Sequence, residues 1–296
     1  MRFRYLVISI LCIFTVFSES SCTRTPDKIE NLRNGDVAVI GHGGPGRQSI
    51  FTYTPLDTYD GYIKALAMDA IDGVEMDVQL SADSTLVLYH DKFLESRTDA
   101  EGLIITKTAE KLAKYHYPKA WYNFDKGGQS IPQLLDILTM LKEKMPEGTF
   151  VLDLKLYPGN MDKEIYMALY ADAVVGTVHA TETDSNVTIE STDIHMLKLL
   201  KERDPDLHYF LYTGSMETGI PLAVEYALYG ITIKYENTTA LWVRRAHENG
   251  LRVAVWGERN NRQNTASLQL HPDYIQTDKI RDLIKKTNKY TSNGEE

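Results

Sequence analysis

Acidic side chains recur in this 296-residue sequence at a spacing that brings carboxylates together. Glu75 and Asp77 are two positions apart in one β-rich run, and Asp153 and Lys155 repeat that spacing in a later run. Side chains two apart on a strand point to the same face. Carboxylates that share a face among apolar neighbours repel each other unless a positive charge lies between them. The pattern therefore predicts either a hard cation, Mg²⁺ or Ca²⁺, bound by Glu75, Asp77 and Asp153, or a salt-bridge cluster closed by Lys155.

Two histidines follow strand-like runs that neighbour these carboxylates. His42 ends the run that starts at Val37, and His90 ends the apolar run that starts at Leu86. Imidazole has a pKa of about 6.5, so it can both donate and accept a proton near neutral pH. We therefore predict that His42 and His90 are a catalytic acid and base. The other histidines fall in loops or helices without such neighbours and are interpreted as ordinary: His116, His179, His195, His208, His247 and His271.

The elements that carry these residues alternate between short β-rich runs and amphipathic helical patterns, as in βα units around parallel strands. The predicted strands are 37–42, 74–80, 149–155, 187–191, 208–213, 230–235, 252–257 and 274–278. The predicted helices are 56–71, 131–145, 162–175, 193–203, 219–228, 239–249, 261–269 and 279–287. This order predicts a single-domain α/β fold, the TIM (β/α)8 barrel, whose active site lies at the C-terminal ends of the strands. The candidate residues fall at those ends.

The segment 84–130 lies outside the predicted strands and helices of the barrel. It begins with the apolar run Leu86–Tyr89 and continues as a polar, aromatic-rich stretch. We expect its start to pair as a strand near the second barrel strand. The remainder reads as a long connection over the mouth of the barrel, because connections of this length in compact domains are often functional.

The residues around the first carboxylate pair also resemble a known family. Residues 73–91 contain a Glu-x-Asp strand followed by His-Asp, with His90 fifteen positions after Glu75. This pattern is closely similar to the core motif of the glycerophosphodiester phosphodiesterase family. Weaker similarities extend the resemblance over about residues 37 to 282, at Ile40–Gly44, Ile131–Leu135, Asp153–Lys155, Val253–Trp256 and Gln276–Asp278.

The resemblance implies metal-dependent hydrolysis of glycerophosphodiesters to glycerol 3-phosphate and an alcohol. It implies the same three metal ligands and the same two histidines that the spacing indicates. It adds Lys155 as a phosphate contact and Trp256 as a residue that lines the substrate pocket. Which histidine is the acid and which is the base stays open.

Three positions depart from the family pattern. Gly43 stands where the family has arginine and Leu56 where it has glutamate, so a cation on the phosphate side is missing. Arg47 on the same loop is the candidate replacement, unless it is a solvated loop residue. Asp153 replaces a glutamate, and the resulting Asp-x-Lys resembles the sphingomyelinase D branch of the same superfamily. Two alternatives therefore stay open: a phospholipase D-like enzyme that acts on intact phospholipids, and a non-catalytic lipoprotein that binds a phosphorylated ligand.

The first residues have the pattern of an export signal. Two arginines precede an apolar run over 5–17, which is shorter than the roughly 20 residues of a membrane-spanning helix. Small residues then lead to Cys22, which resembles the lipobox cysteine of bacterial lipoproteins, although Glu19 stands where that motif has an apolar residue. We expect lipidation of Cys22 and anchoring to a bacterial cell-envelope membrane, on its periplasmic or cell-surface side. The alternative is ordinary signal cleavage that leaves an unpaired thiol.

The predicted organisation is a signal peptide at 1–22, a tether at 23–35, a barrel at 36–287 and a polar tail at 288–296. A hydrophobic content of 43% fits one large globular domain, and a net charge of −9 argues against a nucleic-acid partner. The expected partners are a small glycerophosphodiester or phospholipid-derived substrate and, through the anchor, a membrane.

Overall fold

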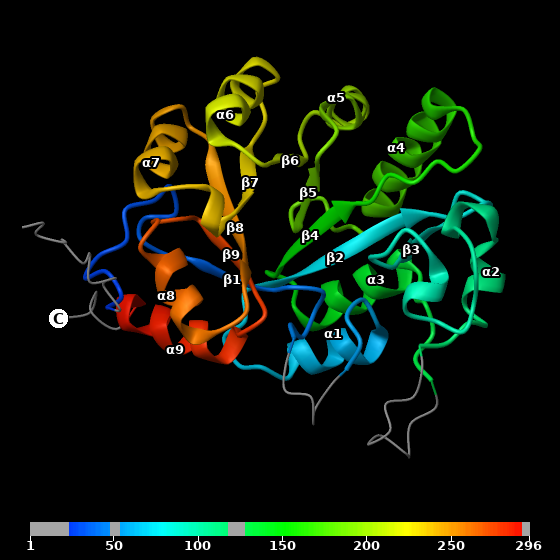
Figure 1. Ribbon diagram of the computed structural model, residues 1–296, viewed down its shortest axis with the longest axis horizontal. Helices are drawn as coiled ribbons and strands as arrows, with labels where there is room; N and C mark the ends of the chain where they lie inside the picture. The colour runs from blue at the N-terminus through cyan, green and yellow to red at the C-terminus, as the bar shows by residue number, and fades with distance from the viewer. Residues whose placement is uncertain (1–23, 48–53, 118–127, 292–296) are drawn as a thin grey trace, which may run out of the picture.

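Eight parallel strands form a closed barrel in the computed structural model, which describes residues 24–47, 54–117 and 128–291 (Figure 1). They are β1 (Ala38–Gly41), β2 (Gly73–Leu80), β4 (Thr149–Leu154), β5 (Val187–Ser191), β6 (His208–Thr213), β7 (Gly230–Lys234), β8 (Arg252–Glu258) and β9 (Tyr274–Thr277). Each strand pairs with the next barrel strand, and β1 pairs with both β2 and β9, which closes the sheet. The predicted TIM barrel is confirmed, and every predicted strand overlaps an observed one.

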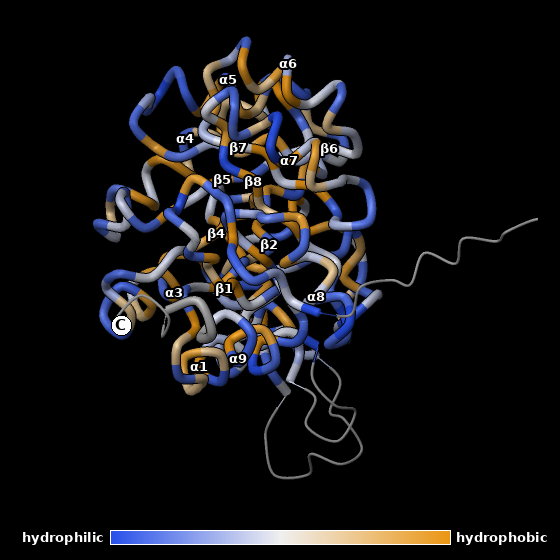
Figure 2. The backbone as a smooth tube through the Cα atoms, turned by 90° about the vertical axis from the view of Figure 1, so that its left-hand side faces the viewer, coloured by the Kyte–Doolittle hydropathy of each residue, from blue (hydrophilic) through white to orange (hydrophobic). Residues whose placement is uncertain are grey.

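Helices connect these strands around the barrel, close to their predicted positions. They are α1 (Tyr59–Leu66), α3 (Leu134–Lys144), α4 (Lys163–Ala180), α5 (Ile194–Arg203), α6 (Met216–Glu225), α7 (Ala240–Glu248), α8 (Asn261–Leu268) and α9 (Ile280–Thr291). Several begin at a side chain that accepts backbone N–H groups of the first turn, such as Asp162 at α4 and Asn260 at α8. Such caps satisfy donors that have no partner inside the helix. Figure 2 shows hydrophobic residues along the central strands and hydrophilic ones on many outer loops.

The lining of the barrel changes from apolar to polar toward the C-terminal ends of the strands. One end holds a cluster of buried apolar side chains, Ala38, Ile40, Val151, Phe210, Ala254 and Tyr274. Above it, Thr232 Oγ1 and Gln276 Nε2 donate hydrogen bonds of 2.5 and 3.0 Å to Glu190 Oε2. These three residues lie on β7, β9 and β5, which are not neighbours, so the bonds cross the barrel interior. Every second residue of a strand faces the barrel interior. The inward-facing positions nearer the mouth are therefore the polar ones.

The segment 84–130 leaves the barrel after β2. Its first part, β3 (Leu86–Leu88), pairs antiparallel to β2, as predicted. The described remainder contains η1 (Leu94–Ser96), η2 (Ile104–Thr106) and α2 (Ala109–Leu112), which share a small apolar core of their own. Figure 1 shows β3 and α2 beside β2. The prediction that this segment covers the mouth falls partly on 118–127, which lie outside the described residues.

The predicted tether packs against the barrel from residue 24 onward. Ile29 is buried, and Asn31 Nδ2 donates to the carbonyl of Pro272 at 2.8 Å. The N–H of Leu32 donates to Asp273 Oδ1 at 2.9 Å. One apolar side chain and a set of satisfied polar groups therefore hold a segment whose composition alone resembles a linker. The proposed anchor residue Cys22 lies outside the described residues.

The chain end also differs from its prediction. Helix α9 continues to Thr291, whereas the helix was predicted to end at 287. Neither glycine nor proline interrupts the sequence before Gly294, so nothing stops the helix at 287. In the described part of the chain, no helix has the length and apolarity that crossing a membrane requires.

The last residue of β8, Glu258, carries a buried carboxyl group. Gly257 has a φ of 104° and the β8–β9 register shifts there, so Trp256 and Glu258 point to opposite faces of the strand. Glu258 Oε1 accepts a hydrogen bond from the hydroxyl group of Ser267 on α8. Glu258 Oε2 is buried and has no hydrogen-bond partner among the described residues. Burial raises the pKa of Glu258 to about 8.

We predict that Glu258→Gln stabilises the protein at pH 8 to 9. The folded state keeps a proton that the unfolded state loses above the ordinary pKa of 4.5. The free energy of unfolding of the wild type therefore falls by up to ~1.4 kcal/mol per pH unit between about 4.5 and 8, and the variant lacks this contribution. Urea unfolding at pH 5, 7 and 9 measures the difference. Identical pH dependence in the two proteins would show that Glu258 is ionised in the folded state.

Candidate active site

The structure brings the three predicted carboxylates together. One oxygen from each of Glu75, Asp77 and Asp153 lies within 4.8 Å of the others. Asp77 and Asp153 are register partners across β2 and β4. Lys155 places Nζ 2.9 Å from Asp77 Oδ1 and also contacts Asp153 Oδ2. The three acidic residues are at most 7% exposed, so water screens their charges poorly.

Burial and mutual repulsion set the protonation of this cluster. Burial, with the charges of Asp77 and Asp153, raises the pKa of Glu75 well above its usual value. Burial also raises the pKa of Asp153, although Lys155 opposes the shift. For Asp77, burial is outweighed by Lys155 and His90, which lower its pKa. A single ammonium therefore does not neutralise three carboxylates at this position.

The cluster fits a hard divalent cation. Its ligands are all oxygen atoms, which Mg²⁺ and Ca²⁺ prefer. Asp77 Oδ2 is buried and has no hydrogen-bond partner among the described residues. Buried polar atoms are almost always paired, so a salt-bridge cluster alone leaves this oxygen unexplained. The raised pKa of Glu75 also favours a bound cation, because a nearby divalent charge stabilises the ionised form of the carboxyl group.

Each candidate histidine is oriented by an aspartate. His42 Nδ1 lies 2.9 Å from Asp278 Oδ1, and His90 Nδ1 lies 2.5 Å from Asp91 Oδ1. Burial opposes ionisation of both aspartates, but hydrogen bonds lower their pKa values below the usual range. An ionised carboxylate can only accept, so each imidazole carries its proton on Nδ1 toward the aspartate. Nε2 of both rings is left available for chemistry.

The two histidines are held in place by contacts outside the cluster. Arg97 Nε donates to Asp91 Oδ2 at 2.7 Å, and Gln79 Nε2 donates to the carbonyl of Asp91 at 2.9 Å. Burial opposes protonation of His42, but the hydrogen bond to Asp278 raises its pKa. The charges of both histidines contribute to the lowered pKa of Asp77, so both lie within electrostatic reach of the carboxylates.

Two of the three departures from the family pattern are in contact. Gly43 has a φ of 55°, and a Cβ atom there would lie 2.6 Å from Leu56 Cβ. The glycine and the leucine therefore fit each other, and the Gly43 N–H donates to Glu75 Oε2 at 2.7 Å. Arg47 has an exposed side chain, and its backbone N–H donates to Asp278 Oδ1 at 3.0 Å. The structure thus links Arg47 to the site through its backbone.

An aromatic wall lies on the strands that face the cluster. Trp256 on β8 and Tyr212 on β6 contact each other edge to face, with ring centroids 5.6 Å apart. Burial, followed by the charge of Asp153, raises the pKa of Tyr212, which places this phenol near the carboxylates. Trp256 Nε1 is buried without a hydrogen-bond partner among the described residues. The indole N–H is therefore a donor that a bound substrate can use.

Sequence reasoning missed polar groups that support the site. Asp57 Oδ1 accepts hydrogen bonds from the backbone N–H of Asp77 at 3.0 Å and from the Tyr62 hydroxyl at 3.2 Å. Its position in the Pro-Leu-Asp-Thr sequence at 55–58 was the available signal. Glu190 is the register partner of Asp153 on β5, and only the closed barrel reveals its bonding partners.

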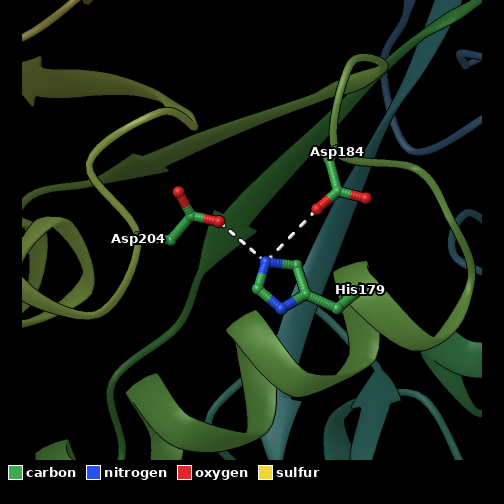
Figure 3. A group of neighbouring side chains, drawn as sticks. All are labelled: His179, Asp184 and Asp204. Atoms are coloured by element: carbon green, nitrogen blue, oxygen red, sulfur yellow. Dashed lines mark hydrogen bonds and ion pairs between the residues drawn. The ribbon is translucent and has the colours of Figure 1, made fainter.

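Figure 3 shows a second group of neighbouring side chains, a histidine between two aspartates. His179 Nε2, in the last turn of α4, lies 2.7 Å from Asp204 and 3.2 Å from Asp184. The His179 and Asp184 side chains are half exposed. These residues precede β5 and β6, whereas active sites of this fold lie where strands end. The ion pairs link two loops, which agrees with the interpretation of His179 as ordinary.

The fold and the side chains at its mouth define a TIM-barrel hydrolase. The chain belongs to the glycerophosphoryl diester phosphodiesterase family, whose model matches residues 51–282. It is therefore an enzyme of the phosphoric diester hydrolase class. His42 precedes the matched range, and the structure places it beside the matched carboxylates.

Individual relatives cover most of the chain. A glycerophosphodiester phosphodiesterase of Caldanaerobacter subterraneus subsp. tengcongensis is 24% identical over 260 residues, which cover 85% of this chain and 98% of the relative. A solved glycerophosphodiester phosphodiesterase of Parabacteroides distasonis has a TM-score of 0.70 at 19% identity and covers 86% of this chain and 97% of its own. An Oleispira antarctica phosphodiesterase, solved with the product sn-glycerol-3-phosphate, has a TM-score of 0.71 at 19% identity, with the same coverage. These likenesses confirm the fold.

Proposed function

We propose that this enzyme hydrolyses glycerophosphodiesters to glycerol 3-phosphate and an alcohol, with a divalent cation and two histidines. One observation carries the proposal. Two imidazoles, each oriented through Nδ1 by an ionised aspartate, present Nε2 near a cluster of three buried carboxylates. A phosphodiester cleavage needs one proton removed and one delivered, together with charge stabilisation at phosphorus, and these groups supply both.

Glu75, Asp77 and Asp153 would hold the cation, Mg²⁺ or Ca²⁺. When bound, this ion supplies positive charge to the phosphodiester oxygens. The Lys155 ammonium adds a fixed positive charge at the same place, because Asp77 and Asp153 raise its pKa despite its burial. Trp256 lines the pocket on the opposite side.

The two histidines exchange protons with the substrate through Nε2. One accepts the proton of the attacking hydroxyl as that oxygen forms its bond to phosphorus. The other donates a proton to the departing alkoxide as its bond to phosphorus breaks. Attack by water gives both products directly, whereas attack by a neighbouring substrate hydroxyl gives a cyclic phosphate that water then opens. Throughout, the two aspartates hold the Nδ1 protons in place.

The substrate class is supported by the family and by the relative described above as a glycerophosphodiester phosphodiesterase. The experiment compares glycerophosphocholine with sphingomyelin and lysophosphatidylcholine, using the chain without residues 1–22 and added Mg²⁺ or Ca²⁺. We expect glycerol 3-phosphate release from glycerophosphocholine to be the fastest reaction. Head-group release confined to the intact lipids would instead indicate a phospholipase D-like enzyme, and binding without turnover a non-catalytic role.

We further propose that the chain is exported and lipid-anchored through Cys22 to a bacterial cell-envelope membrane. The support is the signal pattern of residues 1–22. The test is mass spectrometry of the mature N-terminus together with detergent partitioning, in wild type and Cys22→Ala. An unmodified cysteine, or equal partitioning of the two proteins into the aqueous phase, would overturn the anchor.

A further inference from the structure

Lys234 ends β7 at the mouth of the barrel. Two residues earlier, Thr232 bonds across the barrel interior to Glu190, so Lys234 lies on the same inner face, one step closer to the mouth. In the closed strand order, β7 is four strands away from β2 in either direction. Lys234 therefore stands on the wall opposite to Glu75 and Asp77.

The stem of Lys234 has room because its neighbour on β8 is a glycine. A Cβ atom on Gly257 would lie 3.2 Å from Lys234 Cγ and 3.4 Å from Lys234 Cε. Gly257 also has a φ of 104°, a backbone conformation that other residues rarely adopt. The register partner of Lys234 is Trp256, so the ammonium stem runs beside the aromatic wall.

The Lys234 ammonium has an exchangeable partner. Its Nζ contacts Glu236 in η3 (Tyr235–Asn237), and the two side chains are 39% and 47% exposed. Exposed ion pairs of this kind contribute about 1 kcal/mol or less, so an anionic ligand can displace the glutamate. Lys155, by contrast, is enclosed by two buried carboxylates of the cluster.

We propose that Lys234 binds a second anionic group of the substrate, on the part that extends from the reacting phosphorus toward Trp256. The ligand class is a glycerophosphodiester whose alcohol carries a further phosphate, such as a short glycerol phosphate oligomer. Diesters with a cationic alcohol, such as choline, are disfavoured by the same charge. Glu236 acts as an internal competitor that holds Lys234 when no second anion is present. This inference rests on the proposed function and deepens it.

The test uses three diesters that share glycerol 3-phosphate and differ in the charge of the alcohol: glycerophosphocholine, glycerophosphoglycerol and deacylated cardiolipin. We expect Lys234→Gln to lower the ratio of kcat/KM for deacylated cardiolipin over glycerophosphocholine by roughly five-fold. Glu236→Gln should raise that ratio, because the competing carboxylate is gone. Lys198→Gln, on the outer helix α5, is the matched control and should leave the ratio unchanged. Added salt should lower the ratio in wild type more than in Lys234→Gln.

Two outcomes overturn the assignment of Lys234 and are separable from failure of the proposed function. If wild type turns over these diesters but the ratio stays unchanged in both Lys234→Gln and Glu236→Gln, Lys234 does not bind the substrate. If wild type turns over none of them, the proposed function fails, and calorimetric titration of the three diesters into the Ca²⁺-loaded protein tests Lys234 alone. Equal affinities of wild type and Lys234→Gln for deacylated cardiolipin would then overturn the proposal.

Discussion

Replacing His90 with alanine is expected to lower kcat for glycerophosphocholine by about 10²- to 10⁴-fold, and His42→Ala should do the same. Each variant removes one of the two groups to which the proposed function assigns proton transfer at the scissile bond. Asp91 and Asp278 keep their other hydrogen bonds to Arg97 and the Arg47 backbone, so the local structure should persist. The double variant should lose less than the product of the single losses, because both groups act in one reaction step. Steady-state release of glycerol 3-phosphate measures each loss.

The matched control for these variants is His179→Ala. His179 also contacts two aspartates, but it lies at the opposite end of the barrel. Its removal should leave turnover at the wild-type level. A small loss in His42→Ala or His90→Ala, with folding verified by circular dichroism, would remove that histidine from the proton-transfer steps. A large loss in His179→Ala would show that the alanine variants act through the fold.

Replacing Glu75 with glutamine is expected to weaken divalent-cation binding by at least about 100-fold, or ~2.7 kcal/mol. Glutamine keeps an oxygen that can accept the Gly43 N–H, so the change removes charge and preserves shape. The metal-free variant should be at least as stable as the wild type, because Asp77 and Asp153 crowd the carboxyl that is removed. Thermal unfolding with increasing Mg²⁺ or Ca²⁺ measures both the cation affinity and the stability of the metal-free protein.

Wild type should gain about 2.7 kcal/mol of unfolding free energy at a cation concentration of 100 Kd, and Glu75→Gln should gain little at that concentration. Glu258→Gln is the matched control, because it replaces a buried glutamate side chain that faces Ser267 and not the cluster. It should retain the full cation-induced shift. Equal shifts in wild type and Glu75→Gln would assign the cation to other residues and leave the three carboxylates as a salt-bridge cluster with Lys155.

The barrel could be predicted from sequence because its signals are local. Each strand is a short β-rich run and each helix repeats apolar residues at helical steps, so every element follows from its own residues. The position of Glu75, Asp77 and His90 relative to one another also follows locally, because β2 and β3 form a hairpin-like pair. The two-residue alternation then determines which side chains face inward.

Other features depend on contacts between residues distant in sequence. Glu190 bonds to Thr232 and Gln276, which lie 42 and 86 positions away, and only barrel closure brings them together. The segment from residue 24 docks because Asn31 and Leu32 find partners 241 positions later. No local pattern encodes such pairings.

The proposed role of Lys234 also depends on residues that are distant in sequence. Its value as a candidate substrate contact comes from facing the carboxylate cluster across the barrel, and from a glycine on the next strand that leaves room for its stem. In sequence it is one lysine at the end of a predicted strand. Such a residue becomes distinguishable only when the strand order is known.

The measurement that tests the central claim most directly is release of glycerol 3-phosphate from glycerophosphocholine by EDTA-treated protein, before and after addition of Mg²⁺ or Ca²⁺. Wild type should be inactive in EDTA and regain turnover with one of the two cations, while His90→Ala should stay at least about 100-fold slower under both conditions. Full turnover after complete removal of divalent cations, or undiminished turnover in His90→Ala, would contradict metal-dependent acid–base hydrolysis at this site.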